Sequence, residues 1–429
     1  MINRILAFTA ALCILLEAGI AGAQEPIVKE RATGSPFAQG KYVPDISFIV
    51  DFSTVARTMS DERYASLEIP GFTHVVPGEG LSHEAMNATN GFNLNYGELT
   101  LASAVDPYFD LFAAFHLTEE SFEMEEVYFT TRALPFGFSF RGGKFRSGFG
   151  RLNEQHPHVW DFADAPLVTR AFFGDEGLVE VGARLSWIAP LPFYVSLNAE
   201  ILRGANEASF GTEGFRDFPG THAIGDSPPP NLKVGYARSS FDIGALSVLY
   251  GVSYAMGESR INAGVDADPA ENPDGYALRA DTGILGADIT LKFLINSYRF
   301  LSLQAEYLNR TMKGDRFDNA GGRERIEKKQ SGMYAQSVFR FAQRWRTGYR
   351  FDLLDTNKEK IGGVSSKLPE NLMRHTAMIE FVPTEFSRIR LQGSHDRSGY
   401  LDGAAKRTTN DEVFLAFTMA IGAHGAHSY

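Results

Sequence analysis

The sequence is poor in two features, cysteine and long apolar runs. Its single cysteine, Cys13, lies in an N-terminal apolar run from Ile5 to Ile20. Residues 24–429 contain no cysteine, which excludes disulfides, thiol catalysis and cysteine-ligated zinc from this part of the chain. After this run, no apolar stretch approaches the roughly 20 residues that a membrane-spanning helix needs. If the chain crosses a bilayer, a closed β-barrel is the structure left to it.

Basic charge is also scarce. The chain has 41 Lys and Arg residues against 52 Asp and Glu residues, which gives a formal net charge of −11. Because nucleic-acid binding depends on basic patches, we expect no nucleic-acid partner. The sequence contains no GxSxG, HExxH or Walker motif. We therefore expect no enzymatic activity.

The N-terminal segment has the pattern of a secretory signal peptide. Arg4 precedes the apolar run, and small residues ending at Ala23 form a cleavage site. We expect residues 1–23 to be removed and residues 24–45 to form a short periplasmic segment. The barrel is then expected to occupy residues 46–429.

Apolar and polar residues alternate along many segments of the remaining chain. Between Val179 and Trp187, for example, apolar residues occupy the odd positions. A period of two is typical of strands with one face toward an apolar medium. We predict sixteen strands, at residues 46–56, 92–104, 108–116, 124–134, 137–146, 178–188, 194–203, 231–238, 244–255, 278–294, 299–310, 331–341, 345–353, 371–381, 387–395 and 411–423. The expected fold class is an all-β, transmembrane antiparallel β-barrel.

The connections between the predicted strands alternate between two classes. Short ones include Asp106-Pro107 and residues 296–298. The long ones are residues 57–91, 147–177, 204–230, 256–277, 311–330, 354–370 and 396–410, and many are rich in turn-forming and charged residues. Short periplasmic turns and long external loops are typical of even-stranded outer-membrane barrels. A soluble β-sandwich would show the same alternation, but sixteen strands exceed one such domain of about 100 residues.

The chain ends on another alternating strand. The odd positions from Val413 to Ile421 are apolar and lead in register to the terminal aromatic residue, Tyr429. Such a strand resembles the signal that outer-membrane barrels present to their assembly machinery, and closure against the first strand would leave no free edge. We expect His424 and His427 to form a polar cap at the membrane surface rather than a metal pair.

The segment around the fifth predicted strand resembles a known family. The run LPFGFSFRGGKFRSGFG, from Leu134 to Gly150, is similar to the turn, strand and inward-going segment of the sixteen-stranded porins of Gram-negative outer membranes, including the phosphate-selective type. This resemblance implies an outer-membrane location among lipid, a homo-oligomer (a trimer), and a loop at 147–177 that folds inward after strand five and narrows the barrel. The stretches HPHVWDFADAPL and GAHGAHSY resemble still more a group of outer-membrane proteins sometimes labelled zinc-regulated receptors.

Charged residues on this loop and on later strands are the candidates for a pore constriction. A sixteen-stranded barrel leaves a water-filled lumen, and charges in a narrow passage of low dielectric are felt strongly. The predicted constriction residues are Arg146, Arg151, Glu154, Asp161, Asp164, Arg170, Arg344, Arg346 and Arg350. They form either a transverse field across the lumen or a balanced, solvated wall. The mixture of charges leaves the preference for anions or cations open.

The same loop contains a candidate metal site. Its imidazole and carboxylate side chains are ligands of the kinds that zinc takes. The candidate ligands are His156, His158, Asp161 and Asp164. The alternative is a hydrogen-bonded loop that packs Trp160 and Phe162, because sequence does not fix the geometry of a loop. No cofactor is expected apart from zinc at this site.

These features predict a porin that passes small hydrophilic or ionic solutes by passive or facilitated diffusion. A zinc-linked uptake protein or receptor is the first alternative. Plugged receptors need about 22 strands and a plug domain, and residues 24–45 are too few for a plug. A structural or adhesive barrel is the further alternative, because several external loops are long.

Overall fold

The computed structural model describes residues 44–72, 86–206, 208–401 and 406–422. The predicted signal peptide and nearly all of the segment that follows it lie outside these residues, as do His424, His427 and Tyr429. None of the helices in the described parts is long and apolar enough to span a bilayer.

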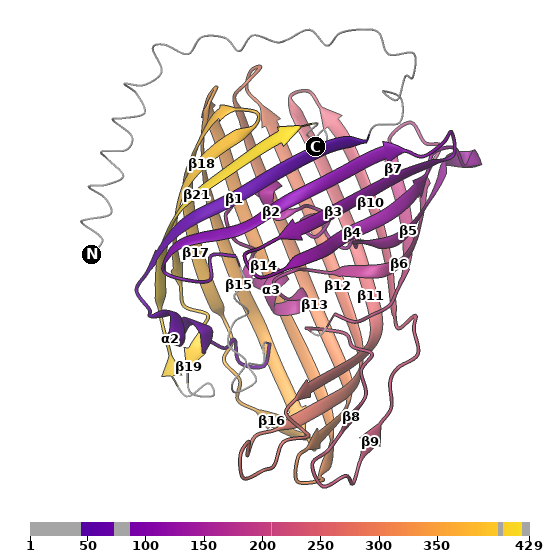
Figure 1. The fold of residues 1–429 in the computed structure, drawn as a ribbon, viewed down its shortest axis with the longest axis vertical. Helices are drawn as coiled ribbons and strands as arrows, with labels where there is room; N and C mark the ends of the chain where they lie inside the picture. The colour runs from indigo at the N-terminus through magenta and orange to yellow at the C-terminus, as the bar shows by residue number, and fades with distance from the viewer. Residues whose placement is uncertain (1–43, 73–85, 207, 402–405, 423–429) are drawn as a thin grey trace. The chain divides into compact units, whose positions relative to one another are not determined.

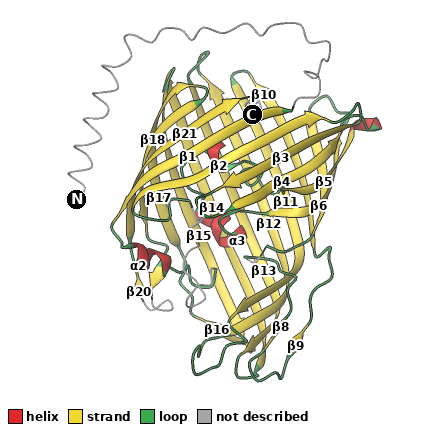
Figure 2. Cartoon of the chain, in the orientation of Figure 1, coloured by secondary structure: helices red, strands yellow, loops and turns green. Residues whose placement is uncertain are grey.

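Sixteen strands form one closed antiparallel barrel (Figure 1, Figure 2). The strands of the ring are β1 (Asp45–Arg57), β2 (Gly91–Ala104), β3 (Phe109–Leu117), β4 (Phe122–Thr131), β5 (Phe138–Arg146), β6 (Val179–Ile188), β7 (Tyr194–Leu202), β10 (Leu232–Ile243), β11 (Leu246–Ala263), β12 (Tyr276–Leu294), β13 (Phe300–Asp318), β14 (Arg323–Ala342), β15 (Trp345–Ile361), β17 (Leu372–Thr384), β18 (Ser387–Asp396) and β21 (Asn410–Gly422). Each pairs with the next, and β21 returns to pair with β1. The seventeenth strand of the sheet, β16 (Val364–Ser366), only extends the hairpin of β15 and β17. The predicted fold class and all sixteen predicted strands are confirmed.

Side chains on these strands alternate between the lumen and the outer surface, as the period of two predicts. On β15, Trp345 and Tyr349 are exposed outward, whereas Arg350 is buried inside. On β21, Met419 and Ile421 lie on the exposed face. Large apolar side chains are exposed on most strands of the ring, and such an exterior belongs in a non-aqueous environment.

The two ends of the barrel differ in their connections. Short turns such as 244–245 and 343–344 join strands at one end, where β1 begins and β21 ends. We call this the turn end. The longest connections, at 58–90, 147–178 and 203–231, leave the opposite end, which we call the loop end.

Strands β11, β13, β14 and β15 are much longer than predicted, and β12 is longer by two residues. They contain 17 to 20 residues each, whereas about 9–11 tilted residues suffice to cross a bilayer. The prediction of long loops at 311–330 and 354–370 was therefore wrong over most of their length, and the first of these shrinks to a turn at 319–322. The loop predicted at 256–277 shrinks to residues 264–275. The reason is that turn-forming and charged residues do not prevent cross-strand pairing where both faces of a hairpin can be polar. In Figure 1 these strands extend beyond their neighbours toward the loop end.

The segment between β5 and β6 folds back into the barrel, as predicted. Its helix α3 (Leu167–Phe173) contacts β13, β14 and β15 from inside. Phe149 and Phe172 of this segment are at most 1% exposed and pack in one apolar core with Phe72 and Phe210 from two other loops. The expected water-filled lumen is therefore only partly present, because apolar side chains fill the region around α3.

Glycines in the wall make room for the inserted segment. A Cβ on Gly286 of β12 would lie 2.8 Å from the Phe149 ring, and one on Gly332 of β14 would lie 3.0 Å from Val168 Cγ2. A larger residue at either position would push into the loop. Glycine in these strands thus marks a close approach between wall and loop.

The remaining elements are short and lie in the connections. They are α2 (Asp61–Ala65), η2 (Pro135–Gly137), η3 (Pro157–Val159), the pair β8 (Phe215–Arg216) and β9 (Ala223–Ile224), and the pair β19 (Tyr400–Leu401) and β20 (Lys406–Arg407).

Candidate functional site

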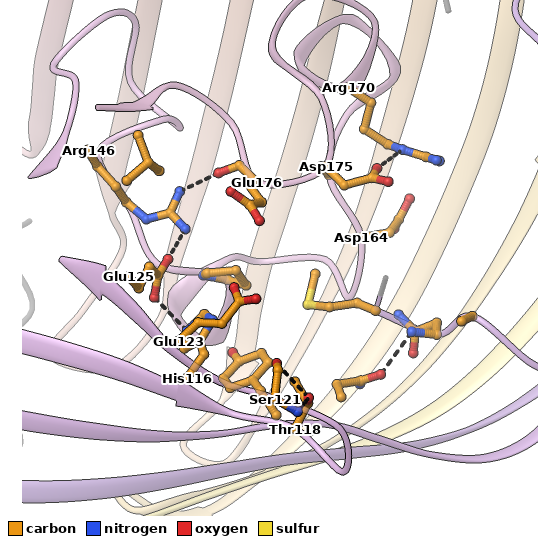
Figure 3. Close-up of a pocket in the computed structure, with 18 of the residues that line it drawn as sticks. His116, Thr118, Ser121, Glu123, Glu125, Arg146, Asp164, Arg170, Asp175 and Glu176 are labelled. Atoms are coloured by element: carbon orange, nitrogen blue, oxygen red, sulfur yellow. Dashed lines mark hydrogen bonds and ion pairs between the residues drawn. The ribbon is translucent and has the colours of Figure 1, made fainter. Parts of the chain in front are cut away.

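The inserted loop lies between two cavities. The turn-end cavity, of about 890 Å³, is lined by the turn at 296–298 and by His156 of the loop. The loop-end cavity, of about 160 Å³, is lined by Tyr64 of α2 and by Glu176 (Figure 3). Arg146 lines both cavities. The two spaces therefore approach each other beside Arg146.

On one side the loop is held by arginines of β15, β17 and β18. We call these residues the arginine wall: Arg346, Arg350, Arg374, Arg388 and Arg390. Asp161 of the loop forms an ion pair with Arg346 at 2.7 Å. Asp164 forms ion pairs with Arg350 and Arg374, both at 2.8 Å. The loop acids therefore contact the arginines directly instead of facing them across open water.

The arginine wall also binds the loop backbone and acids of its own strands. Arg388 and Arg390 donate hydrogen bonds to the Trp160 carbonyl, at 3.1 and 2.8 Å. Glu380 of β17 lies 2.7 Å from Arg390. Asp352 of β15 lies 2.9 Å from the Arg350 guanidinium. With the loop in place, this wall is a dense network of buried pairs.

The other predicted constriction residues are divided between the two cavities. Arg151 and Arg344 line the turn-end cavity, whereas Arg170 lines the loop-end cavity. Glu154 forms an ion pair with Arg184 of β6 at 3.0 Å. The structure thus brings Asp161 and Asp164 to the arginine wall but does not gather the predicted residues into one ring.

On the opposite side of the loop, imidazoles and carboxylates meet. We call these four residues the His/Glu cluster: Glu98 of β2, His116 of β3, Glu125 of β4 and His156 of the loop. Glu98 Oε2 lies 3.2 Å from His116 Nε2 and 3.2 Å from His156 Nδ1. Glu125 Oε2 lies 2.5 Å from His116 Nε2 and 3.4 Å from His156 Nδ1. The four atoms lie within 4.8 Å of one another, so they converge on a single point.

Further polar groups hold the His/Glu cluster from behind. Arg146 pairs with Oε1 of Glu125, and Figure 3 shows Arg146, Glu125 and His116 connected in series. Glu126 Oε2 lies 2.7 Å from His156 Nε2, and the backbone N–H of Arg146 donates to Glu126 Oε1 at 2.6 Å. Because Arg146 holds Oε1 of Glu125, Oε2 of Glu125 is directed at the centre of the cluster. Because Glu126 holds Nε2 of His156, Nδ1 of His156 is directed at the same centre.

His116 was not among the predicted site residues. It lies directly opposite Glu98 in the pairing of β2 with β3, and its ring stacks on Tyr96 with centroids 4.7 Å apart. The period of two could have identified it, because the even positions of β3, such as the buried Ala114, face the lumen.

Glu125 was also missed, for a different reason. Ala114 pairs with Glu126 and Phe115 pairs with Met124, so Glu125 is an extra residue without a partner on β3. Such a β-bulge re-aims side chains and is common beside functional sites. Here it lets two consecutive acids, Glu125 and Glu126, both be buried in the lumen. A strict alternation would have turned one of them outward.

The four predicted metal ligands are separated in the structure. His156 belongs to the His/Glu cluster, and His158 Nδ1 lies 3.3 Å from Glu98 Oε2. Asp161 and Asp164 instead bind the arginine wall. Any metal site in this region therefore takes its carboxylates from the strands rather than from the loop.

Ion pairing controls the pKa of the loop carboxyls. Burial raises the pKa of Asp164, but Arg350 and Arg374 outweigh burial and lower that pKa to about 2. Burial also raises the pKa of Glu154, and its neighbouring guanidiniums likewise lower it to about 2. Both groups are therefore charged at neutral pH.

The two loop histidines differ from each other. Burial lowers the pKa of His156, but the surrounding carboxylates, Glu98 first, outweigh burial and raise that pKa well above its usual value. Burial lowers the pKa of His158. Of the two imidazoles, His156 is thus the one whose protonated form the neighbouring carboxylates stabilise.

Several solved outer-membrane proteins are similar to this chain at low sequence identity. They are OmpT of Vibrio cholerae in its trimer form (10% identity, TM-score 0.49, 88% of this chain and 100% of that chain), the outer membrane channel DcaP of Acinetobacter baumannii (11%, 0.48, 89% and 98%) and an anion-selective porin from Comamonas acidovorans (10%, 0.44, 88% and 99%). The strand pairing of this chain by itself defines its architecture.

One protein sequence is much more similar. A protein of Aquifex aeolicus (strain VF5), described as "Uncharacterized protein", is 47% identical over 395 residues, which are 92% of this chain and 82% of that protein. No known family model matches the chain. The chain, a closed sixteen-stranded barrel with an inserted loop, belongs to the same family as this A. aeolicus protein.

Proposed function

We propose that this chain is a porin of a Gram-negative outer membrane, through which small hydrophilic or ionic solutes diffuse past the inserted loop. One observation supports this function above others. A closed barrel with an apolar exterior holds two polar cavities, one toward each end, which approach each other beside Arg146. Transport, and not catalysis, is the use that this arrangement suits.

The exterior of the barrel supports a membrane location. Val252 of β11 is 56% exposed, Leu285 of β12 is 53% exposed and Ile421 of β21 is 69% exposed. Apolar side chains on the outer face of every strand are what a bilayer requires of a barrel, since closure satisfies the backbone polar groups. Facing water, the same surface would promote aggregation.

The two cavities carry opposite charge excesses, which bears on the choice of solute. In the turn-end cavity, basic residues outnumber acidic residues. The basic residues are Arg141, Arg146, Arg151, Lys292, Arg340, Arg344, Arg346 and Arg388, and the acidic residues are Glu126, Glu154, Glu380 and Glu385. In the loop-end cavity, acidic residues outnumber basic residues. The acidic residues are Glu123, Glu125, Asp164, Asp175, Glu176 and Glu412, and the basic residues are Lys144, Arg146, Arg170 and Arg374. An ion of either sign is favoured in one cavity and disfavoured in the other. We therefore expect weak ion selectivity and a current that depends on voltage polarity.

Single-channel recording in planar bilayers tests this function. The refolded full chain is expected to give discrete conductance steps, smaller than those of an open sixteen-stranded barrel because the loop fills part of the lumen. A salt gradient should give a reversal potential near zero, as weak selectivity requires. Absence of steps in bilayers, together with absence of solute uptake into liposomes that contain the folded protein, would contradict transport.

We also propose that the protein forms a homo-oligomer. The resemblance of the segment around the fifth strand to sixteen-stranded porins supports a homo-oligomer, a trimer. Light scattering on the detergent-solubilised protein would measure it, and a monomer as the main species would oppose it.

Metal-linked uptake is the second candidate function. The observation that favours it is the His/Glu cluster, since His116 and Glu125 line the loop-end cavity while His156 lines the turn-end cavity. A solute that passes between the cavities would meet these side chains. Uptake of radioactive zinc into liposomes, with and without the protein, distinguishes this function from a general diffusion channel.

A further inference from the structure

We propose that Glu98, His116, Glu125 and His156 bind one divalent transition-metal cation of the zinc class, between the two cavities. The inference deepens the proposed function, on which it rests only for its position along the solute path. Metal binding itself can be measured without conduction.

The distances inside the His/Glu cluster fit a tetrahedral ion. Metal-to-ligand distances of about 2.0–2.1 Å place neighbouring ligand atoms of a tetrahedron about 3.3–3.4 Å apart. Glu98 Oε2 lies 3.2 Å from both His116 Nε2 and His156 Nδ1, and Glu125 Oε2 lies 3.4 Å from His156 Nδ1. Three edges of the tetrahedron are thus already close to their expected length. A fourth edge, between His116 and Glu125, is 2.5 Å and needs to open. The remaining two edges, Glu98–Glu125 and His116–His156, lie within 4.8 Å.

The donor set selects the class of metal. Two imidazole nitrogens and two carboxylate oxygens suit zinc and similar ions, whereas calcium and magnesium prefer oxygen alone. Charge balance agrees with a dication. An imidazole that binds a metal is neutral and releases its proton. With the metal in place, the carboxylates of Glu98, Glu125 and Glu126 and the guanidinium of Arg146 then sum to −2, which one divalent cation neutralises.

Outer contacts orient the ligands as they do in metal proteins. Glu126 lies 2.7 Å from Nε2 of His156, the ring nitrogen that faces away from the cluster centre. A carboxylate behind a ligating histidine fixes its tautomer and its ring orientation. Arg146 holds Oε1 of Glu125, which leaves Oε2 toward the centre. Two of the four ligands are therefore positioned by a second residue.

The position of the cluster gives a cation access from both sides. His116 and Glu125 line the loop-end cavity, where acidic residues are in excess, and His156 lines the turn-end cavity. Acidic surroundings raise the local concentration of cations. The loop-end cavity is therefore the expected entrance for the metal.

An alternative use of these residues is a buried network of ion pairs without metal. Elsewhere in the described chain, ion-paired histidines have simpler surroundings: His395 lies 2.6 Å from Asp411, and His222 lies 2.8 Å from Asp217. One carboxylate is enough for such a pair. Two carboxylates and two imidazoles converging within 4.8 Å go beyond what pairing needs.

Metal binding to the folded, full-length protein in detergent tests the site. Isothermal titration with Zn²⁺ is expected to show one tight site per chain, and Co²⁺ is expected to give the visible spectrum of a tetrahedral complex. His116→Gln and Glu125→Gln should each weaken Zn²⁺ binding by at least about 100-fold, the upper range for outer contacts. His395→Gln is the matched control and should leave the tight site unchanged. Circular dichroism and heat-dependent gel mobility identify any variant that does not fold.

The possible outcomes separate this inference from the proposed function. Tight Zn²⁺ binding that survives both substitutions in folded protein, or no tight binding to the unmodified chain, would overturn the metal site. A channel that conducts and is not affected by Zn²⁺ binding would leave the porin function intact while removing the site from the solute path. Binding without any conductance would retain the site and contradict the channel.

Discussion

The inserted loop meets two walls of different chemistry. Toward β15, β17 and β18 it meets guanidiniums, and Asp164 and Asp161 pair with them directly. Toward β2, β3 and β4 it contributes His156 to a group of imidazoles and carboxylates that converge on a point. Both contacts are polar and buried, yet the first joins each loop acid to an arginine, whereas the second leaves four ligand atoms facing a common centre.

This difference separates anchoring from binding. Arginine is always charged and its planar fork matches carboxylates and carbonyls, so it suits a permanent clamp. Imidazole can accept a proton or a metal, so it suits a site that exchanges its occupant. The loop is therefore fixed on one side and can bind a ligand on the other.

Breaking the clamp should have the largest effect. Asp164→Ala leaves Arg350 and Arg374 buried without this partner, and loss of one partner of a buried pair costs about 3–5 kcal/mol. Because Asp352 still contacts both arginines, at 2.9 and 3.3 Å, we expect the lower end of that range. Urea unfolding in detergent measures the free energy, and the single-channel conductance should rise as the loop loosens. A loss below about 1 kcal/mol, the level of an exposed pair, would show that the wall does not anchor the loop.

A change behind the metal ligands should have a smaller effect, and only on binding. Glu126→Gln keeps a hydrogen-bond acceptor for His156 but removes the charge, and outer contacts of this kind are worth about 10–100-fold in metal affinity. That range corresponds to about 1.4–2.7 kcal/mol. Zinc titration of the folded variant measures it. Equal affinity in Glu126→Gln and the unmodified chain would mean that Glu126 does not orient His156.

An ion pair at the loop end provides a reference for the clamp. Asp175 pairs with Arg170 at 2.7 Å, but half of its side chain is exposed. Exposed pairs contribute about 0–1 kcal/mol, so Asp175→Ala should hardly change the urea midpoint. A loss as large as that of Asp164→Ala would remove the distinction between the buried wall and the exposed loop end.

The clamp should be insensitive to pH over the ordinary range. The folded pKa of Asp164 is lowered to about 2, below the value of about 3.9 for an unfolded aspartate. Its stabilisation is therefore complete above about pH 5 and is lost as the pH falls from about 4 through 2. Comparison of Asp164→Asn with the unmodified chain between pH 8 and pH 5 should show a constant difference in unfolding free energy. A difference that shrinks within that range would contradict the strong pairing with Arg350 and Arg374.

The strands could be predicted because a barrel wall imposes a strict period of two. Where one face meets an apolar medium, as at Tyr349 and Trp345, the alternation is visible in the sequence. Beyond the expected apolar band this constraint disappears. On β14, burial still alternates, but the buried face holds the charged Lys328 as well as Ile326. Polarity therefore no longer alternates in the sequence, and the far ends of β11 to β15 resembled loops.

The candidate site was predictable only in part. Arg346 and Arg350 were placed in the lumen because their register followed from the strand period. Glu125 could not be placed, since a bulge breaks that period locally. The partners of His156 could not be identified because nothing in a loop sequence states which strands it will approach. Sequence supplied the residue types, and tertiary contacts selected the pairs.

The bulge in β4 has an evolutionary implication. A single inserted codon is enough to turn one more carboxylate toward the interior without disturbing the rest of the strand, since the pairing on either side resumes at once. A general diffusion barrel with a histidine on the adjacent strand could gain a chelating residue by this route in one mutational step. The same insertion offers protein engineers a minimal way to graft cation recognition onto an existing pore.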